Sequence, residues 1–469
     1  MHSRRKLFPA LTLSLLLGAC NMAPHYVRPA LPVPDATPHG PAYGADGGTG
    51  AIIPADTAWR DFFVDQRLVR VIDRSLTNNR DLRIALANVA RARAQYRVQR
   101  ADLLPTVAAQ GSASYQDAPF AQNGASGRLD IYQAQLGISA WEIDLFGRVR
   151  NLSEAAQQSY FAAAENRNAA QTALIAEVAT VWLTMAADRE RLNIARDLES
   201  AFGKTLELTR ARFAKGIASE LEVRQAQTSY DQARSDIAEA TTLVAQDQNA
   251  INLLAGSTVP EADLPNSLPQ SGATLENLPE NIASDLLLRR PDIAAAEYQL
   301  RGANADIGAA RAAFFPNISL TAAFGTLSMG LSNLFSGGSE FWSVAPSARL
   351  PIFDFGRNKG NLRVAEANRD AMVAQYEKSV QTGFREVADA LARRGTMTAQ
   401  LEAQLSLAES SRVAYRLSEA RFRAGVDGFL TTLDSQRALY SAERSLLATR
   451  LVRAANMVEL YRALGGGLK

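Results

Sequence analysis

The residues that most often carry catalysis or bind metals are confined to one end of this chain. The three histidines are His2, His25 and His39, and Cys20 is the only cysteine among 469 residues. The body of the chain therefore has no internal disulfide and no Cys/His metal site. An enzyme would have to use paired carboxylates, and no such cluster stands out from the solvated helix faces. We therefore expect no enzymatic activity, no metal and no cofactor.

Cys20 has a sequence context of its own. A positive segment at 4–6 precedes an apolar stretch at 7–17, which is too short to span a bilayer comfortably. The order Leu-Gly-Ala-Cys at 17–20 resembles a bacterial lipobox, in which the cysteine sulfur carries a covalent lipid such as palmitate. We predict a lipoprotein signal peptide at 1–19 and a lipid anchor on Cys20, with an ordinary signal peptide as the alternative. Asn21, rather than Asp, follows the cysteine, which favours delivery to the outer membrane.

Composition and charge narrow the class of partner. The chain is 47% hydrophobic but only 7% aromatic, so its buried surfaces must consist largely of small side chains such as Ala. That composition suits helices packed at close range. Lys and Arg number 50 against 48 Asp and Glu, with both signs interspersed. Because no basic stripe results, nucleic acid is not an expected partner.

Prolines divide the chain into helical blocks and connections. One cluster lies between Pro24 and Pro54 and a second between Pro260 and Pro279, whereas 120–259 and the chain after Pro351 contain none. The proline-free blocks are predicted to be helical. The clusters predict an extended N-terminal arm at 20–66, following the anchor, and a Pro-rich connection between two halves at 257–283.

The two halves repeat one another. Residues 81–105 align with 292–316 without a gap and end on Pro105 and Pro316. Phe-Gly-Arg at 146–148 recurs at 355–357, and Ala-Arg-Phe at 211–213 recurs at 420–422. Landmarks of this kind in the same order predict a tandem duplication, with repeats at 67–256 and 284–469.

Each repeat has the same predicted elements. A first helix stops where proline disfavours helical geometry in the preceding residue, and alternating apolar and polar residues then predict a β-hairpin. A long helix, a glycine reversal and a return helix follow, with apolar positions suited to narrow coiled-coil seams. For the first and second repeat the predicted ranges are helix 67–104 and 284–315, hairpin 105–143 and 316–352, long helix 148–215 and 357–424, and return helix 219–256 and 428–465.

The predicted strands have one apolar and one largely polar face, as in a transmembrane barrel with a water-filled lumen. An edge of a soluble β-sandwich is the alternative. Trp141 and Trp342 fall near strand ends, where an aromatic girdle at the membrane interface would place them, although either could be a packing residue. Four strands cannot close a barrel, and an open edge in lipid would leave backbone groups unsatisfied. Several chains must therefore share one wall.

These residues resemble a known family, the TolC-like outer membrane factors, and within it the OprM/NodT-type efflux lipoprotein branch. The most specific stretches are 20–29, 59–63, 91–105, 141–148, 350–357 and 421–437. The resemblance implies an α+β membrane protein, a homotrimer with a twelve-stranded transmembrane β-barrel that continues as a periplasmic α-helical barrel. It implies a passive outer membrane channel of a multidrug efflux pump, opened by a periplasmic adaptor and an inner-membrane resistance-nodulation-division transporter.

The resemblance also assigns roles to residues. The periplasmic gate would consist of Leu430 as an apolar constriction, Asp434 as an acidic ring, Arg437 as its pairing partner, and Phe422, which stands where a tyrosine is common. An ordinary surface pair between Asp434 and Arg437 is the alternative, and Gly428 replaces a residue that is Asn in relatives. The expected adaptor-docking tips are formed by Arg212, Phe213, Gly216 and Ile217 in the first repeat and by Arg421, Gly425 and Val426 in the second.

Two other functions remain open from the sequence. A type I protein secretion conduit would have the same architecture, although the lipobox favours efflux. A lipid-anchored coiled-coil scaffold without a pore would account for the long helices but not for the paired amphipathic hairpins. The exported compound cannot be named from this chain, because the pump is expected to select it.

Overall fold

The computed structural model describes residues 21–43, 57–119, 126–270, 272–275 and 283–467. The predicted signal peptide and Cys20 lie outside these residues. The chain forms two compact units, and each draws on both repeats. Unit 1 contains 1–30, 88–164 and 295–377, and unit 2 contains 31–87, 165–294 and 378–469.

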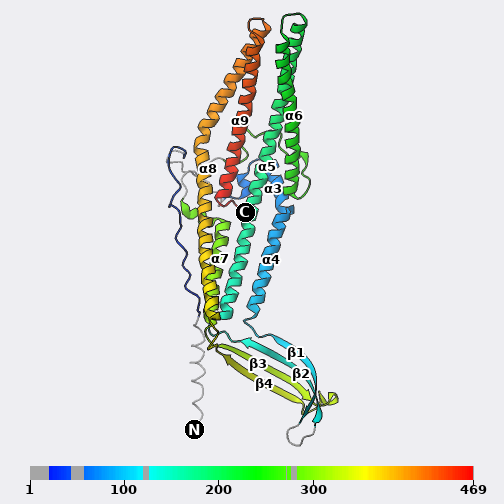
Figure 1. Cartoon of the computed structure of the whole chain (residues 1–469), viewed down its shortest axis with the longest axis vertical. Coiled ribbons are helices and arrows are strands. Elements are labelled where there is room, and N and C mark those ends of the chain that lie inside the picture. The colour runs from blue at the N-terminus through cyan, green and yellow to red at the C-terminus, as the bar shows by residue number, and fades with distance from the viewer. Residues whose placement is uncertain (1–20, 44–56, 120–125, 271, 276–282, 468–469) are drawn as a thin grey trace. The chain divides into compact units, whose positions relative to one another are not determined.

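Unit 1 is organised around one antiparallel sheet in the order β1-β2-β3-β4 (Figure 1). Its strands are β1 (Val107–Pro119), β2 (Ser126–Glu142), β3 (Asn317–Ser328) and β4 (Glu340–Arg349). The two hairpins predicted from the alternating pattern thus join through β2 and β3 into one sheet. Gly325 lies at this junction, where a Cβ would come within 2.1 Å of the Ala134 carbonyl oxygen, so only glycine fits.

Long helices make up most of each repeat outside the sheet. They are α4 (Arg80–Ala101), α5 (Arg148–Ala214), α6 (Glu220–Ala255), α7 (Pro291–Ala312), α8 (Arg357–Arg423) and α9 (Phe429–Ala463). Among the described helices, only α5 has a window apolar enough to cross a membrane, and 61% of that window is buried inside the chain. It is therefore a core helix by burial.

The first predicted helix of each repeat differs from the structure. The helix predicted at 67–104 is two helices, α3 (Gln66–Asn78) and α4, because Asn79 takes an extended ψ of 136° and caps α4 by accepting the Leu82 N–H at 2.9 Å. The helix predicted to start at 284 begins instead at Pro291, after a short 3₁₀ segment, Ser284–Arg289. Proline is well suited to the first helical position because it has no N–H to leave unpaired.

The core of unit 2 is aromatic where the end of the predicted N-terminal arm (20–66) contacts α9. The short helix α2 (Trp59–Phe62) and the following Phe63 are buried, and Phe62 stacks on Tyr461 with ring centroids 4.6 Å apart. Trp182 of α5 is fully buried as well and donates its indole N–H to the Asp263 carbonyl at 3.1 Å. The Pro-rich connection is thereby attached to the long helix of the first repeat.

Candidate functional site

The sheet of unit 1 has two chemically different faces. Its register aligns Ala109, Leu136, Phe324 and Trp342 in one row across the four strands. The last three are 56%, 63% and 76% exposed, so the chain itself does not cover this apolar row. Side chains alternate between faces along a strand, so neighbouring positions point the other way. This apolar face therefore requires a nonpolar environment outside the chain.

Glutamines occupy the opposite face. Gln135 donates to Gln110 at 3.3 Å, and Gln133 donates to Gln135 at 2.6 Å, which forms a polar ladder across β1 and β2. Ser319 and Ser347 contact one another at 2.8 Å between β3 and β4. A sheet with exposed apolar groups on one side and hydrogen-bonded amides on the other fits a wall between lipid and water.

Both edges of this sheet are open. Within the part of the chain that the structure describes, β1 pairs only with β2 and β4 pairs only with β3. Exposed edges in a bilayer would leave a row of backbone donors and acceptors without partners, at a cost of several kcal/mol per group. The edges must therefore pair with strands of other chains.

The two predicted girdle tryptophans lie on the same face of the sheet. Trp342 pairs with Phe324, and Trp141 pairs with Leu320 beyond a β-bulge that keeps it on the face of Ile138. Four residues of β3 separate the two rows, or about 13 Å. That separation is too short for opposite margins of an apolar band about 25 Å tall.

A second aromatic pair was missed by the sequence analysis. Tyr115 and Tyr132 pack edge to face, with ring centroids 5.9 Å apart, beside the distal loop of the first hairpin. Tyr132 pairs with Ser328, eight residues of β3 from the Trp141 row, or about 26 Å. At a strand tilt of about 40° this is about 20 Å along the membrane normal, so the tyrosines and Trp141 lie nearer to the two margins of the apolar band than the two tryptophans do. The signal was present in the sequence as tyrosines flanking the loop.

The two helical hairpins in unit 2 reverse through the same glycine turn. Gly216 has φ +69° and Gly425 has φ +74°, a left-handed conformation that favours glycine. The next residue in each case donates its N–H back to the helix, Ile217 to Arg212 and Val426 to Arg421, both at 2.9 Å. At these tips the side chains of Phe213, Ile217 and Val426 are exposed.

The helices after the two turns start differently. Ser219 caps α6 in a reciprocal capping box with Glu222, whereas Gly428 at the start of α9 provides no side-chain cap. Arg421 instead binds Asp427 through two hydrogen bonds of 2.6 and 2.8 Å and holds the pKa of that carboxyl below its usual value. The second tip thus has an exposed ion pair where the first has a side-chain cap.

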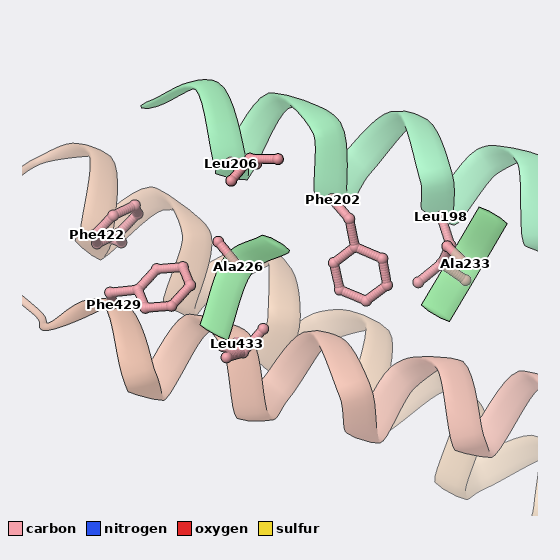
Figure 2. Packing of buried hydrophobic residues seen from close by; sticks show 8 residues of the cluster. All are labelled: Leu198, Phe202, Leu206, Ala226, Ala233, Phe422, Phe429 and Leu433. Carbon is pink, nitrogen blue, oxygen red and sulfur yellow. The ribbon is translucent and has the colours of Figure 1, made fainter. Parts of the chain in front are cut away.

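Side chains from both hairpins meet in one apolar cluster (Figure 2). Phe422, which was predicted as a gate residue, is 3% exposed and packs edge to face against Phe429 with centroids 5.9 Å apart. Arg212 of the first tip lies over the Phe422 ring at 4.8 Å. Phe422 therefore joins the two hairpins. The other members of the cluster are Leu198, Phe202, Leu206, Ala226, Ala233 and Leu433.

The remaining predicted gate residues lie on the exposed face of α9. Leu430 is 55% exposed and Asp434 is exposed. Arg437 does not pair with Asp434 within this chain, since its guanidinium donates to the Ser229 hydroxyl on α6 at 3.1 Å. Neither the predicted pair nor the ordinary surface pair is therefore formed inside one chain.

Three further residues tie α6 to α9 and were not found from the sequence. The Tyr440 hydroxyl donates to Asp236, and Arg444 lies 3.9 Å from the same carboxylate. Burial and the Asp236 charge together raise the pKa of Tyr440 to about 12, so the phenol stays protonated and remains a donor. Nothing in the spacing of these residues distinguishes them from ordinary helix-surface groups.

The repeated architecture matches a known family. The profile of the family described as "Outer membrane efflux protein" matches residues 71–257 and again 282–466. The chain belongs to this family. The double match also confirms the tandem duplication.

Relatives in this family resemble the chain over nearly its whole length. The "Probable efflux pump outer membrane protein TtgC" of Pseudomonas putida is 45% identical over 97% of this chain and 94% of its own. The outer membrane protein OprJ of Pseudomonas aeruginosa is 44% identical over 98% of this chain and 95% of its own. Among solved structures, the open-state MtrE outer membrane channel of Neisseria gonorrhoeae has a TM-score of 0.86 at 39% identity, covering 96% and 99% of the two chains.

Family membership confirms the predicted fold and function. The protein is an outer membrane channel of an efflux pump, and it extends into the periplasm. It is a homotrimer, and the open-edged sheets of three chains form one twelve-stranded barrel that continues as a helical barrel.

Proposed function

We propose that this channel is the passive exit duct for small apolar compounds and that it has no catalytic role of its own. Relatives at 44–45% identity are named for toluene, solvent and antibiotic efflux. The sheet supports the same role, because its glutamine face offers uncharged hydrogen-bonding groups to a water-filled pore. Within the described residues, no three His, Cys, Asp or Glu side chains gather as a metal site.

The open-edged sheet is the main observation that supports the proposed exit duct. In the barrel wall, Leu136 faces lipid and its neighbour Gln135 faces the lumen. Leu136→Arg should then prevent insertion, since a charge facing the bilayer midplane costs about 2–4 kcal/mol per chain, whereas Gln135→Arg should leave the trimer intact. Both variants would be examined for trimers in outer membranes and for conductance in planar bilayers. Equal behaviour of the two variants would refute this assignment of the lipid and lumen faces.

The gate in this proposal is the exposed face of α9. Leu430 and Asp434 are four residues apart and lie on one face of the helix, so three chains would present an apolar ring and an acidic ring. The bond from Arg437 to Ser229 and the contacts of Asp236 with Tyr440 and Arg444 join α9 to α6 within one chain. In this proposal, opening of the gate breaks these contacts.

Adaptor docking is assigned to the two glycine tips. Phe213 is 46% exposed, and Ile217 and Val426 are 63% exposed each, so the tips carry apolar side chains that nothing in this chain covers. The backbone at Gly216 and Gly425 is open, with no atom within 4 Å of an added Cβ. A partner can therefore approach closely there.

The lipid anchor on Cys20 completes the proposal. The lipobox at 17–20 is its only support, since the residue itself lies outside the described part of the chain. Intact-mass measurement of the mature N-terminal peptide tests it directly: a diacylglycerol and acyl mass on Cys20 is expected, and an unmodified cysteine would contradict it.

A further inference from the structure

Residues 21–28, which follow the anchor, lie along helix α7. Arg28 forms a 2.9 Å ion pair with Glu297, and the Tyr26 hydroxyl donates to the same carboxylate at 3.2 Å. Asn304 donates to the Pro24 carbonyl at 2.8 Å. These contacts all lie within unit 1.

Gly308 provides the closest approach. A Cβ on this residue would lie 2.7 Å from the backbone of Ala23, closer than real Cβ atoms come to other atoms. From Ala23 to Arg28 the arm covers five residues, or about 16 Å when extended. From Gly308 to Glu297 the helix covers eleven residues, also about 16 Å. Residues 23–28 of the arm are therefore nearly extended and run antiparallel to α7.

The contact residues of α7 form one stripe, which we call the arm track: Glu297, Arg301, Asn304 and Gly308. Their spacing of four, three and four residues places them on a single helix face. Arg301 binds Glu297 at 2.6 Å and lies over the Tyr26 ring at 5.0 Å, so it links the track to the arm as well. The Arg28 and Arg301 hydrogen bonds outweigh burial and hold the pKa of Glu297 below its usual value, so the carboxylate stays charged.

The other repeat lacks this track. With the offset of 211, the positions of α4 that correspond to the track are Leu86, Ala90, Arg93 and Arg97. An arginine replaces the glycine that admits Ala23, and a leucine replaces the carboxylate that binds Arg28. The track is therefore specific to the second repeat, against which the arm lies.

The N-terminal end of the arm, at Asn21, lies where the strands of the sheet meet the helices. The Asn21 side-chain oxygen accepts hydrogen bonds from Asn151 at 2.9 Å and from its own neighbour Ala23 at 3.0 Å. Asn151 is in the first turn of α5, shortly after β2 ends at Glu142, and Cys20 is bonded directly to Asn21. This junction is the periplasmic margin of the barrel wall.

We infer that the arm track is a docking site for the lipidated arm and that it fixes the acyl chains of Cys20 at the inner margin of the barrel. The inference rests on the proposed acylation of Cys20. An acyl chain stabilises membrane attachment by about 0.8 kcal/mol per buried CH₂ group. The full effect is available only if the cysteine is held at the level of the acyl region. The track sets that level relative to the strands.

The test uses the full-length lipoprotein trimer in unsealed outer membrane fragments, in which an added protease reaches the periplasmic face. His25 is exposed, so His25→Cys provides a spin-label site on the arm while Cys20 is acylated. The track variant combines Glu297→Ala with Asn304→Ala, and its matched control combines Leu86→Ala with Arg93→Ala at the corresponding positions of α4. The label should be immobile in the parent and control and mobile in the track variant. Chymotrypsin should cleave after Tyr26 about tenfold faster in the track variant, because cleavage follows the released population of the arm.

The outcomes separate the two claims. An unmodified Cys20 in the intact-mass measurement would refute the anchor, and with it this inference. An acylated Cys20 with unchanged label mobility and cleavage in the track variant would refute the track alone. If the track variant yields no trimer, Arg28→Ala, which leaves α7 intact, takes its place with the same two readouts. Release of the arm by either variant, with the control unaffected, supports the track.

Discussion

The side-chain amide of Asn79 donates a 3.0 Å hydrogen bond to the carbonyl of Leu254, in the last turn of α6. The second repeat has the same arrangement, in which Arg290 donates to the Ala463 carbonyl at 2.8 Å in the last turn of α9. The offsets are 211 for the donors (290 − 79) and 209 for the acceptors (463 − 254), as in the sequence alignment. Each repeat thus closes its last helix onto the start of its first.

These closures should be unequal in strength. Asn79→Ala removes a buried hydrogen bond and the cap of α4, at an expected cost of about 2 kcal/mol. Arg290 is 4% exposed and also binds Asp292 and Glu386, so Arg290→Ala leaves Asp292 without this partner, while Glu386 keeps its ion pair with Arg462. The loss of this buried, charge-assisted hydrogen bond should cost about 3 kcal/mol. Denaturant unfolding of the detergent-solubilised trimer measures both. Arg83→Ala, an exposed position on α4, serves as the control, and an equal loss there would contradict the assignment.

Gate substitutions should open the pore at rest. Asp434→Ala removes the acidic ring, and Arg437→Ala removes the bond to Ser229, so each should raise single-channel conductance several-fold in planar bilayers. Tyr440→Phe should act in the same direction by releasing Asp236. With the offset of 209, Gln225 on α6 corresponds to Asp434, and Gln225→Ala should leave conductance unchanged. Unchanged conductance in the α9 variants would remove these residues from the gate.

The missing cap on α9 can be supplied. Gly428 has φ −74° and ψ 160°, a conformation that serine adopts without strain. Gly428→Ser should stabilise the first turn of α9 by about 0.3 kcal/mol and slow amide hydrogen exchange there by less than about twofold. Ser219→Ala should have the opposite effect on α6. If exchange at α9 does not slow, the end of the helix is already held by contacts other than its cap.

One carboxyl pair predicts a pH dependence. Burial, followed by the nearby charge of Asp188, raises the pKa of Asp247 to about 6, and Arg191 binds Asp188 at 3.1 Å. The unfolded carboxyl titrates near pH ~3.9, so folding takes up a proton and stability falls as the pH rises from about 4 to about 6. Asp247→Asn should therefore stabilise the protein at pH 7, by about 1 kcal/mol because water screens the pair, and not at pH 4.

The second repeat suggests how that variant would fit. Asn456 corresponds to Asp247 by the offset of 209 and donates to the Ala390 carbonyl at 3.1 Å. An amide is thus already accepted at the equivalent position. Thermal unfolding at both pH values measures the effect, and a gain of the same size at pH 4 would show that the carboxyl charge is not responsible.

Patterns repeated along the chain were the easiest features to predict. Prolines at 105 and 316, the alternating strands and the glycine reversals each have a local physical cause, so the elements and their order follow from the sequence. The break at Asn79 was missed because its cause is distant: the side chain is held by Leu254 as well as capping α4. A sequence window cannot contain both contacts.

The site was harder to predict for the same reason. Leu430, Asp434 and Arg437 were assigned through family resemblance, and the structure shows that the partner of Arg437 within one chain is Ser229. The tie between Tyr440 and Asp236 joins residues 204 positions apart on different helices. The single register that pairs β2 with β3 could not be derived either, since both hairpins would be self-consistent alone.

The unpaired edges of β1 and β4 have a genetic consequence. Each chain completes the wall of two neighbours, so one chain with a damaged edge leaves a gap that two sound chains cannot close. A defective allele expressed beside a normal one should therefore be dominant, because only trimers drawn wholly from normal chains would seal. Cells carrying both copies should lose resistance to exported compounds out of proportion to the amount of mutant protein.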